Sequence, residues 1–249
     1  MTLPPRLYKY RSFGNRDHVI DLLGRGRIFA PSPAQFNDPF DCMPRVDTRG
    51  DKNQRARLRN EVVTSSGLPP TRHERRKADA MIKSKMRHKS SLDDSLTSIV
   101  RGNIFKGCGV ISLAEDPDNV LMWSHYGHSH TGFCVEFDTS RFPFLHAEQV
   151  TYTADRPVLY PLVESDQVTM DKALFCKAYY WAYEKEWRVV MQKAGAHDIP
   201  SIAMTGVILG ARTSAENEAM VRELVGDRAV FLKRAVFDDY KFRLDIEPA

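Results

Sequence analysis

Residues with catalytic potential gather in two short stretches of this 249-residue chain. In the later stretch, Glu184-Lys-Glu-Trp-Arg188, two carboxylates and an arginine recur at every other position. Alternate residues of a strand share one face, so Glu184, Glu186 and Arg188 are predicted to point the same way. Aligned carboxylates repel each other, and a partly buried one is expected to have a raised pKa. The pattern favours a functional site, with surface neutralisation by Arg188 as the alternative.

The earlier stretch, 121–130, holds Trp123, Tyr126 and three histidines within ten residues. It lies between two apolar segments with strand character, 109–114 and 133–138, and it is predicted to form a short helix. Asp118 or Asn119 can cap this helix. Aromatic and polar side chains between two strands favour a pocket, and the alternative is ordinary packing with polar tips at the surface.

The histidines of this stretch leave a metal site open as an alternative. His125 and His128 share a helical face at spacing i, i+3, but His130 does not continue that face. Glu136 or Asp138 could complete a ligand set, yet the combination matches no familiar template. A metal-dependent hydrolase or nuclease that uses the three histidines is therefore kept as an alternative, while no metal is predicted.

The flanking segments predict an α+β fold with a split, mainly antiparallel sheet around a cleft, in which the strands near Tyr8, Val110, Val135 and Val189 lie together. Further strands are expected at 7–12, 27–30, 149–153, 183–191, 202–209, 229–235 and 240–246, and helices at 15–23, 169–182 and 214–225. Asn15 is the expected cap of the first helix. Asp38 and Asp41 are expected to pin a turn-rich loop at 34–41.

The length allows one large domain or two small ones, and a single domain, 1–249, is expected. The contents of 42% hydrophobic and 27% charged residues are typical of a globular protein. No apolar run approaches the ~18 residues of a membrane span, and the N-terminus lacks a signal-peptide core, so we expect a cytoplasmic protein without membrane contact. The four cysteines form no CxxC pair, which argues against a cysteine zinc site and favours buried thiols.

The net charge of +4 is unevenly distributed. Residues 45–90 hold 14 Lys and Arg against five Asp and Glu, a net +9, while the rest of the chain holds 22 against 27. Charge-rich helices are expected at 51–65, 71–87 and 92–100, so 49–105 is predicted to be a basic helical insertion. Its cations Arg72, Arg75, Arg76 and Lys77 are candidate contacts to nucleic acid, with a solvated helical face as the alternative.

Four motifs resemble a bacterial family known as domain of unknown function 2971. They are Leu7-Tyr-Lys-Tyr-Arg-Ser12, Phe36-Asn-Asp-Pro-Phe-Asp41, Met122-Trp-Ser-His-Tyr126 with Gly132-Phe-Cys-Val-Glu-Phe-Asp138, and Glu184-Lys-Glu-Trp-Arg188. The motif order is also similar, more distantly, to the ADP-ribosyltransferase superfamily. The chain departs from that superfamily because no Ser-Thr-Ser triplet follows the second strand and the first strand has no histidine.

The second resemblance implies an enzyme that cleaves NAD and transfers ADP-ribose to an anionic macromolecule, in phage defence or as a toxin. It implies Glu186 as the catalytic carboxylate, with Glu184 orienting or deprotonating the acceptor and Tyr126 stacking on nicotinamide. Arg11 would bind the pyrophosphate as a fork donor. Further candidate contacts to the cofactor are Tyr10, Ser112, Trp123 and His125. A non-enzymatic nucleic-acid-binding or defence module remains a separate alternative.

Overall fold

The computed structural model describes residues 2–47, 71–86, 106–160 and 164–249, together with isolated helical positions at 53, 56, 59–60, 63–64, 97–98 and 102. The chain divides into two compact units. Unit 1 comprises residues 1–36, 107–152 and 179–249, and unit 2 comprises 37–106 and 153–178. The predicted insertion, 49–105, falls within unit 2.

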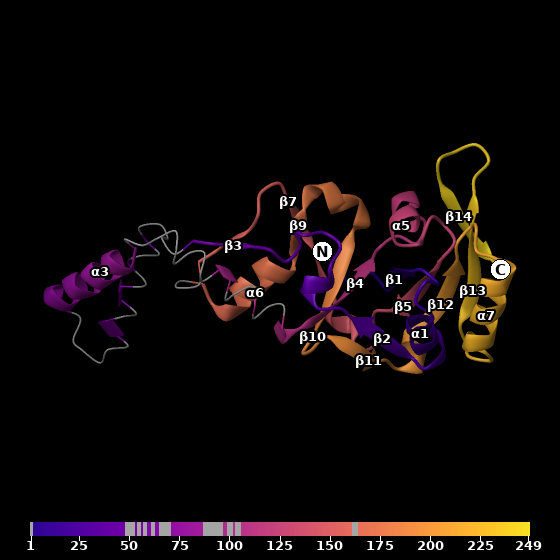
Figure 1. The fold of residues 1–249 in the computed structure, drawn as a ribbon, viewed down its shortest axis with the longest axis horizontal. Helices are drawn as coiled ribbons and strands as arrows, with labels where there is room; N and C mark the ends of the chain where they lie inside the picture. The colour runs from indigo at the N-terminus through magenta and orange to yellow at the C-terminus, as the bar shows by residue number, and fades with distance from the viewer. Residues whose placement is uncertain are drawn as a thin grey trace. The chain divides into compact units, whose positions relative to one another are not determined.

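Unit 1 is built on an eight-stranded sheet of order β14-β13-β12-β5-β1-β4-β10-β6 (Figure 1). Its strands are β1 (Arg6–Arg11), β4 (Gly109–Ala114), β5 (Phe133–Asp138), β6 (Glu148–Gln149), β10 (Glu186–Met191), β12 (Met204–Leu209), β13 (Phe231–Phe237) and β14 (Leu244–Pro248). Neighbours are antiparallel except for the parallel pair β12 and β13. This confirms a mixed fold with a large, mostly antiparallel sheet, in which the four strands predicted to lie together are consecutive.

The pairing within this sheet is uneven around β1. Six registered pairs join β1 to β5, from Arg6 opposite Asp138 to Arg11 opposite Phe133. Six more join β4 to β10. Between β1 and β4, only Tyr8 opposite Ala114 is in register. The sheet therefore contains two closely paired blocks, β1–β5 and β4–β10, which are joined by a short ladder.

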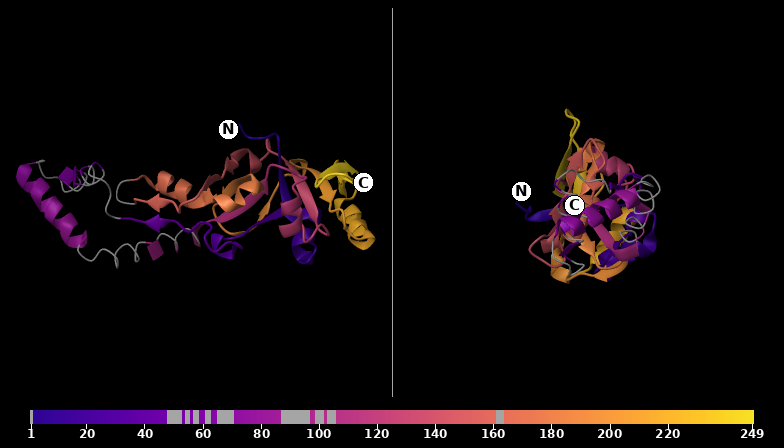
Figure 2. Two further views of the ribbon diagram at one scale, coloured as in Figure 1. Left: turned by 90° about the horizontal axis from the view of Figure 1, so that it is seen from above. Right: turned by 90° about the vertical axis from the view of Figure 1, so that its left-hand side faces the viewer.

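The two faces of the sheet bury different clusters, because successive side chains of a strand point to opposite sides. Leu7 belongs to the larger cluster with the apolar side chains of α1 (Arg16–Val19), the π-helix η1 (Ile20–Gly24) and α7 (Ala215–Val225). Tyr8 and Tyr10 belong to the smaller cluster with α5 (Val120–His125). The α7 helix packs against η1, on the larger cluster's side (Figure 2). Alternate side chains of β1 thus enter different clusters.

Local polar signals set the helix starts. The Asn15 side chain accepts a hydrogen bond from the backbone of His18, and that of Asn119 accepts from Leu121 and Met122, so both predicted caps are confirmed. The remaining elements of unit 1 are β2 (Arg27–Ala30), which pairs with β11 (Gly195–Asp198), and the short helices η2 (Pro33–Gln35), η3 (Phe144–His146), η4 (Tyr179–Glu184) and η5 (Ser201–Ala203). None of the described helices is long and apolar enough to cross a membrane.

Unit 2 contains the parallel pair β3 (Arg45–Val46) and β8 (Val158–Leu159), the helices α3 (Arg72–Met86) and α6 (Asp166–Leu174), and β9 (Cys176–Ala178). The strand β7 (Thr151–Thr153) lies where the chain passes from one unit to the other. As predicted, Asp38 pins its loop by accepting from the Phe40 backbone at 2.8 Å. Asp41 forms a buried ion pair with Lys177 at 3.6 Å.

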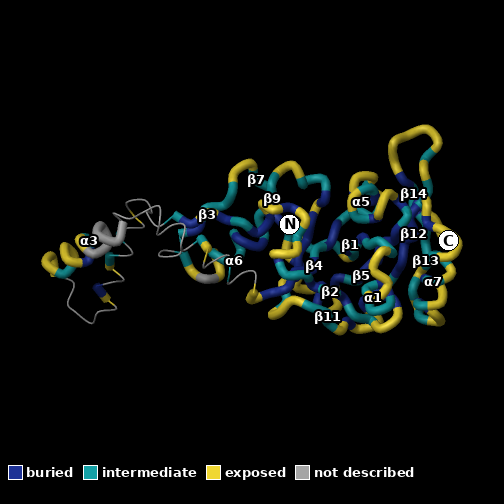
Figure 3. Tube along the Cα trace, viewed as in Figure 1, coloured by how far each residue is buried: buried dark blue, intermediate teal, exposed yellow. Residues whose placement is uncertain are grey.

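The two helices predicted in this part of the chain differ in outcome. The helix expected at 169–182 is wrong in extent, since α6 ends at Leu174 and β9 follows. The helix expected at 71–87 is confirmed as α3, whose described side chains are mostly exposed (Figure 3). The helices expected at 51–65 and 92–100 lie largely outside the described residues.

Candidate functional site

A pocket of about 250 Å³ lies in unit 1, where β1 ends. It is lined by the last residues of β1, the start of α1 and the end of α5, namely Tyr10, Arg11, Ser12, Asn15, His18, Val19, His125, Tyr126, His128 and Phe133. Four predicted site residues, Tyr10, Arg11, His125 and Tyr126, which come from two of the motifs, are therefore brought together. No acidic side chain lines this pocket among the residues that the structure describes.

The turn Gly127–Gly132 holds the wall of this pocket against the end of β1. A Cβ atom added to Gly132 would lie 2.2 Å from the Arg11 carbonyl oxygen, so only glycine permits this approach. Three successive residues, His128, Ser129 and His130, have left-handed φ angles of 48°, 55° and 68°. Such conformations are unfavourable for residues other than glycine and persist where the surrounding structure imposes them, often at functional sites.

Arg11 is the principal charged group of the pocket. Its Nη2 atom donates to the Phe29 carbonyl at 3.5 Å, and no described carboxylate pairs with it. Burial lowers the pKa of its guanidinium. A guanidinium has five N–H donors and recognises carboxylate or phosphate in a fork geometry. Because His18, His125 and His128 surround the same space, the pocket has the chemistry of an anion site.

Tyr126 connects the pocket to a buried carboxylate. Its hydroxyl donates to Glu184 Oε1 at 2.7 Å, and Glu184 is buried at the end of η4. The neighbouring His125 Nδ1 lies 2.9 Å from the Tyr183 hydroxyl. The residues just before β10 thus fix two side chains that line the pocket.

Glu186 has a different environment from Glu184, which corrects the prediction of one aligned face. Lys185 has a left-handed φ of 43°, so the strand begins only at Glu186 and Glu184 remains in η4. Glu186 accepts two hydrogen bonds from Arg188, at 2.8 and 3.0 Å, and both residues are buried. It is not among the residues that line the pocket.

Ser112 and Trp123 also lie outside the pocket lining. The Ser112 carbonyl accepts from Lys9 Nζ at 2.6 Å. Trp123 is fully buried, donates to the Pro117 carbonyl at 2.8 Å and meets Tyr10 edge-on at 5.1 Å. Burial also raises the pKa of Tyr10, whose hydroxyl donates to the Asp116 carbonyl. These groups support the pocket from behind.

The three histidines separate into two environments. His125 and His128 line the pocket, whereas His130 is buried beside Trp123, with Nε2 3.3 Å from the Ser124 hydroxyl. Among the described residues, no group of three His, Cys, Asp or Glu side chains is placed to hold a metal ion. The geometry therefore gives no support to a metal site at these histidines.

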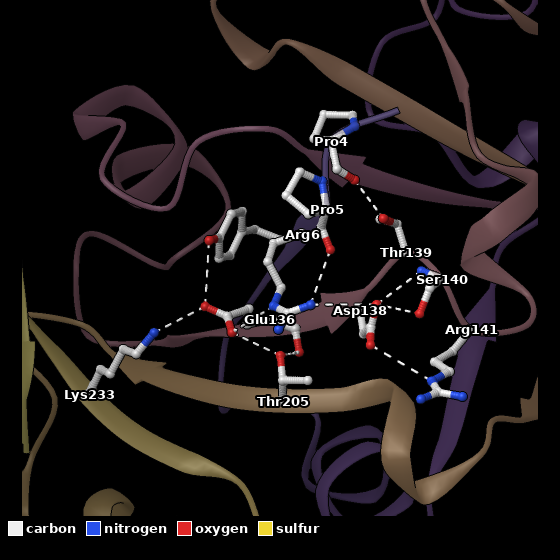
Figure 4. A network of polar contacts seen from close by, with 11 residues as sticks. Pro4, Pro5, Arg6, Glu136, Asp138, Thr139, Ser140, Arg141, Thr205 and Lys233 are labelled. Atoms are coloured by element: carbon white, nitrogen blue, oxygen red, sulfur yellow. Dashed lines mark hydrogen bonds and ion pairs between the residues drawn. The ribbon is translucent and has the colours of Figure 1, made fainter. Parts of the chain in front are cut away.

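The opposite end of β1 carries a polar network of another kind (Figure 4). The Glu136 carboxylate accepts from Thr205 at 2.8 Å and from Lys233 at 3.0 Å, and Arg6 lies 3.5 Å away. Arg6 also pairs with Asp138 at 3.4 Å. Burial raises the pKa of Glu136, but the contacts with Thr205, Lys233 and Arg6 together outweigh burial and leave this pKa below its usual value.

The predicted nucleic-acid contacts belong to unit 2. Arg72, Arg75, Arg76 and Lys77 are all exposed on α3. Lys77 Nζ lies 3.4 Å from Glu74, one turn earlier in the helix. The helix therefore presents its cations to solvent.

Sequence reasoning did not assign Ser12, Asn15 or His18 to a site, and it considered His128 only as a possible metal ligand. Asn15 was expected only as a helix cap, and His18 lies within the same predicted helix. The proximity of Ser12, Asn15 and His18 to Arg11 in the sequence is the signal that could have identified them, because a helix that directly follows a strand begins beside the strand's end.

A match to a known family covers the site residues that come later in the chain. Residues 122–189 match the sequence model of a family described as protein of unknown function (DUF2971). This match supports the family predicted from the motifs and covers Tyr126, Glu184 and Glu186. No curated protein and no solved structure matches the chain.

Proposed function

We propose that unit 1 binds NAD in the pocket at the end of β1 and cleaves its nicotinamide–ribose bond, transferring ADP-ribose to an anionic macromolecule. The observation that supports this most is Arg11, a partly buried guanidinium in a pocket without a described acid. Uncompensated burial of a cation is unfavourable, so the site is suited to a ligand that supplies the negative charge. The pyrophosphate of NAD has the charge and oxygen geometry for this guanidinium.

The sparse pairing of β1 and β4 supports the predicted split in the sheet. One registered pair, Tyr8 opposite Ala114, joins the well-paired β1–β5 and β4–β10 blocks. We retain, as part of this proposal, the cleft that the sequence analysis predicted within the split sheet.

The chemistry begins with departure of nicotinamide, which takes the electrons of the C–N bond and leaves an oxocarbenium-like ribose. A nearby carboxylate stabilises that positive charge. The acceptor's nucleophile then bonds to the anomeric carbon, and a general base accepts its proton. The Tyr126 ring, which lines the pocket, would contact the nicotinamide.

Glu184 is favoured over Glu186 as the reacting carboxylate. Glu184 accepts a hydrogen bond from Tyr126, a residue that lines the pocket, so it is linked to the proposed ligand site through that side chain. Glu186 would first have to lose two hydrogen bonds to buried Arg188, which would leave a buried charge unpaired. We therefore assign Glu186 the role of fixing the start of β10.

Incubating the purified chain with NAD and measuring released nicotinamide tests this assignment. Glu184→Gln is expected to lower the rate by about 10²-fold or more while the protein stays folded. Glu186→Gln is expected to act mainly through stability, at a cost of about 3 kcal/mol. Wild-type activity that Glu184→Gln leaves unchanged would refute the catalytic role of Glu184.

A non-enzymatic nucleic-acid-binding function is the second candidate, and the exposed cations of α3 favour it. Replacing Arg72, Arg75, Arg76 and Lys77 with alanine should weaken nucleic-acid binding and reduce its salt dependence, since each phosphate contact contributes nearly one unit of slope. Unchanged binding would identify α3 as a solvated face.

A further inference from the structure

The tip of the β13–β14 hairpin, residues 238–243, exposes two aromatic rings that no other described residue covers. Tyr240 is 95% exposed and Phe242 is fully exposed. The hairpin extends away from the sheet in Figure 1 and in the right-hand view of Figure 2. Large exposed aromatic side chains that occur together mark interaction surfaces more often than isolated ones do.

The tip is fixed by one carboxylate. Asp238 Oδ1 accepts from the backbone of Tyr240 at 2.7 Å and of Lys241 at 2.8 Å. Its second oxygen accepts from Arg243 at 2.7 Å. These contacts lower the pKa of Asp238, the bond from the Tyr240 backbone contributing most. The two rings are thus presented by an ordered turn, which reduces the entropy lost when a ligand stacks on them.

One cation on this hairpin and one beside it have no acidic partner among the described residues. Lys241 lies between the two rings in sequence and is exposed. Arg212 is also exposed, and its guanidinium lies over the Phe237 ring at 5.7 Å. Aromatic faces interleaved with available cations are the features that bind single-stranded nucleic acid, through stacked bases and nearby phosphates.

Phe237 and Arg212 lie next to the turn that forms one wall of the pocket in unit 1. The Phe237 ring lies 5.3 Å from His130, and the backbone of Arg212 donates to the His130 carbonyl at 2.9 Å. His130 belongs to the turn Gly127–Gly132, which also supplies His128 to the pocket. A strand bound along Phe237, Tyr240 and Phe242 would therefore have one end beside the pocket wall.

We propose that the β13–β14 hairpin is a stacking site for single-stranded nucleic acid, with bases on Tyr240 and Phe242 and phosphates at Lys241 and Arg212. Its role does not depend on NAD cleavage, and it is separate from the basic helix α3. If the proposed function is also correct, this site would hold the acceptor strand.

Fluorescence anisotropy with labelled 12-nucleotide oligo(dT) and oligo(U) tests this site in the full chain. Removing each ring is expected to weaken binding by at least about fivefold, so Tyr240→Ala with Phe242→Ala should lose about 25-fold or more. Matched controls are Phe231→Ala and Tyr180→Ala, which remove rings that are 72% and 89% exposed elsewhere in unit 1. Both controls should bind as wild type does.

Several outcomes would overturn the proposal. They are no oligonucleotide binding by wild type, equal binding by the double variant, or an equal loss in the control variants. Sedimentation that shows a dimer in wild type and a monomer in the double variant, without oligonucleotide binding, would instead assign the tip to self-association. Unchanged circular dichroism of the double variant establishes that a loss of binding is local.

Discussion

The two ends of β1 each carry an arginine, and the two arginines have opposite surroundings. Arg6 lies between Glu136 and Asp138 in a network that also includes Lys233. Arg11, five residues later, has one long hydrogen bond to a carbonyl and no described acid. The comparison separates charge that stabilises the fold from charge that is available to a ligand. A charged residue is informative about function only when its partners are known.

The largest expected effect comes from the backbone approach at the pocket end. Gly132→Ala would place a Cβ 2.2 Å from the Arg11 carbonyl, and neither backbone can easily move. Thermal unfolding should show a loss on the order of 3 kcal/mol, or roughly 6–12 °C in Tm.

The matched substitution at the other end is Gly206→Ala, whose Cβ would lie 3.3 Å from the Phe231 carbonyl. This change should cost less than about 1 kcal/mol, because alanine restricts the unfolded chain and the clash is small. Equal losses for the two variants would mean that the pocket end is no more constrained than the Glu136 end.

Replacing the two arginines should change stability in opposite directions. Arg6→Met removes ion pairs that are partly exposed and should destabilise the protein by about 1 kcal/mol or less. Arg11→Met removes a cation that lacks an acid and should stabilise it by on the order of 1 kcal/mol. Urea denaturation measures both, and destabilisation by Arg11→Met would contradict the view of Arg11 as a binding group.

The smallest effect is in the pH dependence of stability. The folded-state pKa of Glu136 lies below its ordinary 4.5, so its stabilising contribution is full above pH 4.5 and is lost as pH falls through the folded-state value. Glu136→Gln should therefore flatten the acid side of the stability curve, by on the order of 1 kcal/mol or less. Thermal melts between pH 3 and pH 7 check this, and an unchanged acid side would remove Glu136 as a titrating contributor.

Local patterns predicted much of the fold. The residues from Leu7 to Ser12 indicated the strand that forms β1, and Asn15 and Asn119 marked two helix starts. These signals depend on residues close in sequence, where periodicity and capping act directly.

Other features depend on contacts that are distant in sequence or on unusual backbone geometry. Lys185 and the run His128–His130 adopt left-handed conformations without glycine, which no propensity indicates. The i, i+2 spacing correctly aligned Glu186 with Arg188, but it could not show that they bind each other rather than a ligand. Spacing alone therefore could not show which side chains bind each other.

Isothermal titration of NAD and of ADP-ribose into wild type, Arg11→Met and Arg6→Met tests the central claim most directly. Wild type and Arg6→Met should bind with equal affinity, whereas Arg11→Met should bind at least about tenfold more weakly, because it loses charge-assisted hydrogen bonds to the pyrophosphate. Equal binding by Arg11→Met, or no binding by wild type, would contradict the assignment of the pocket at the end of β1 as an NAD site.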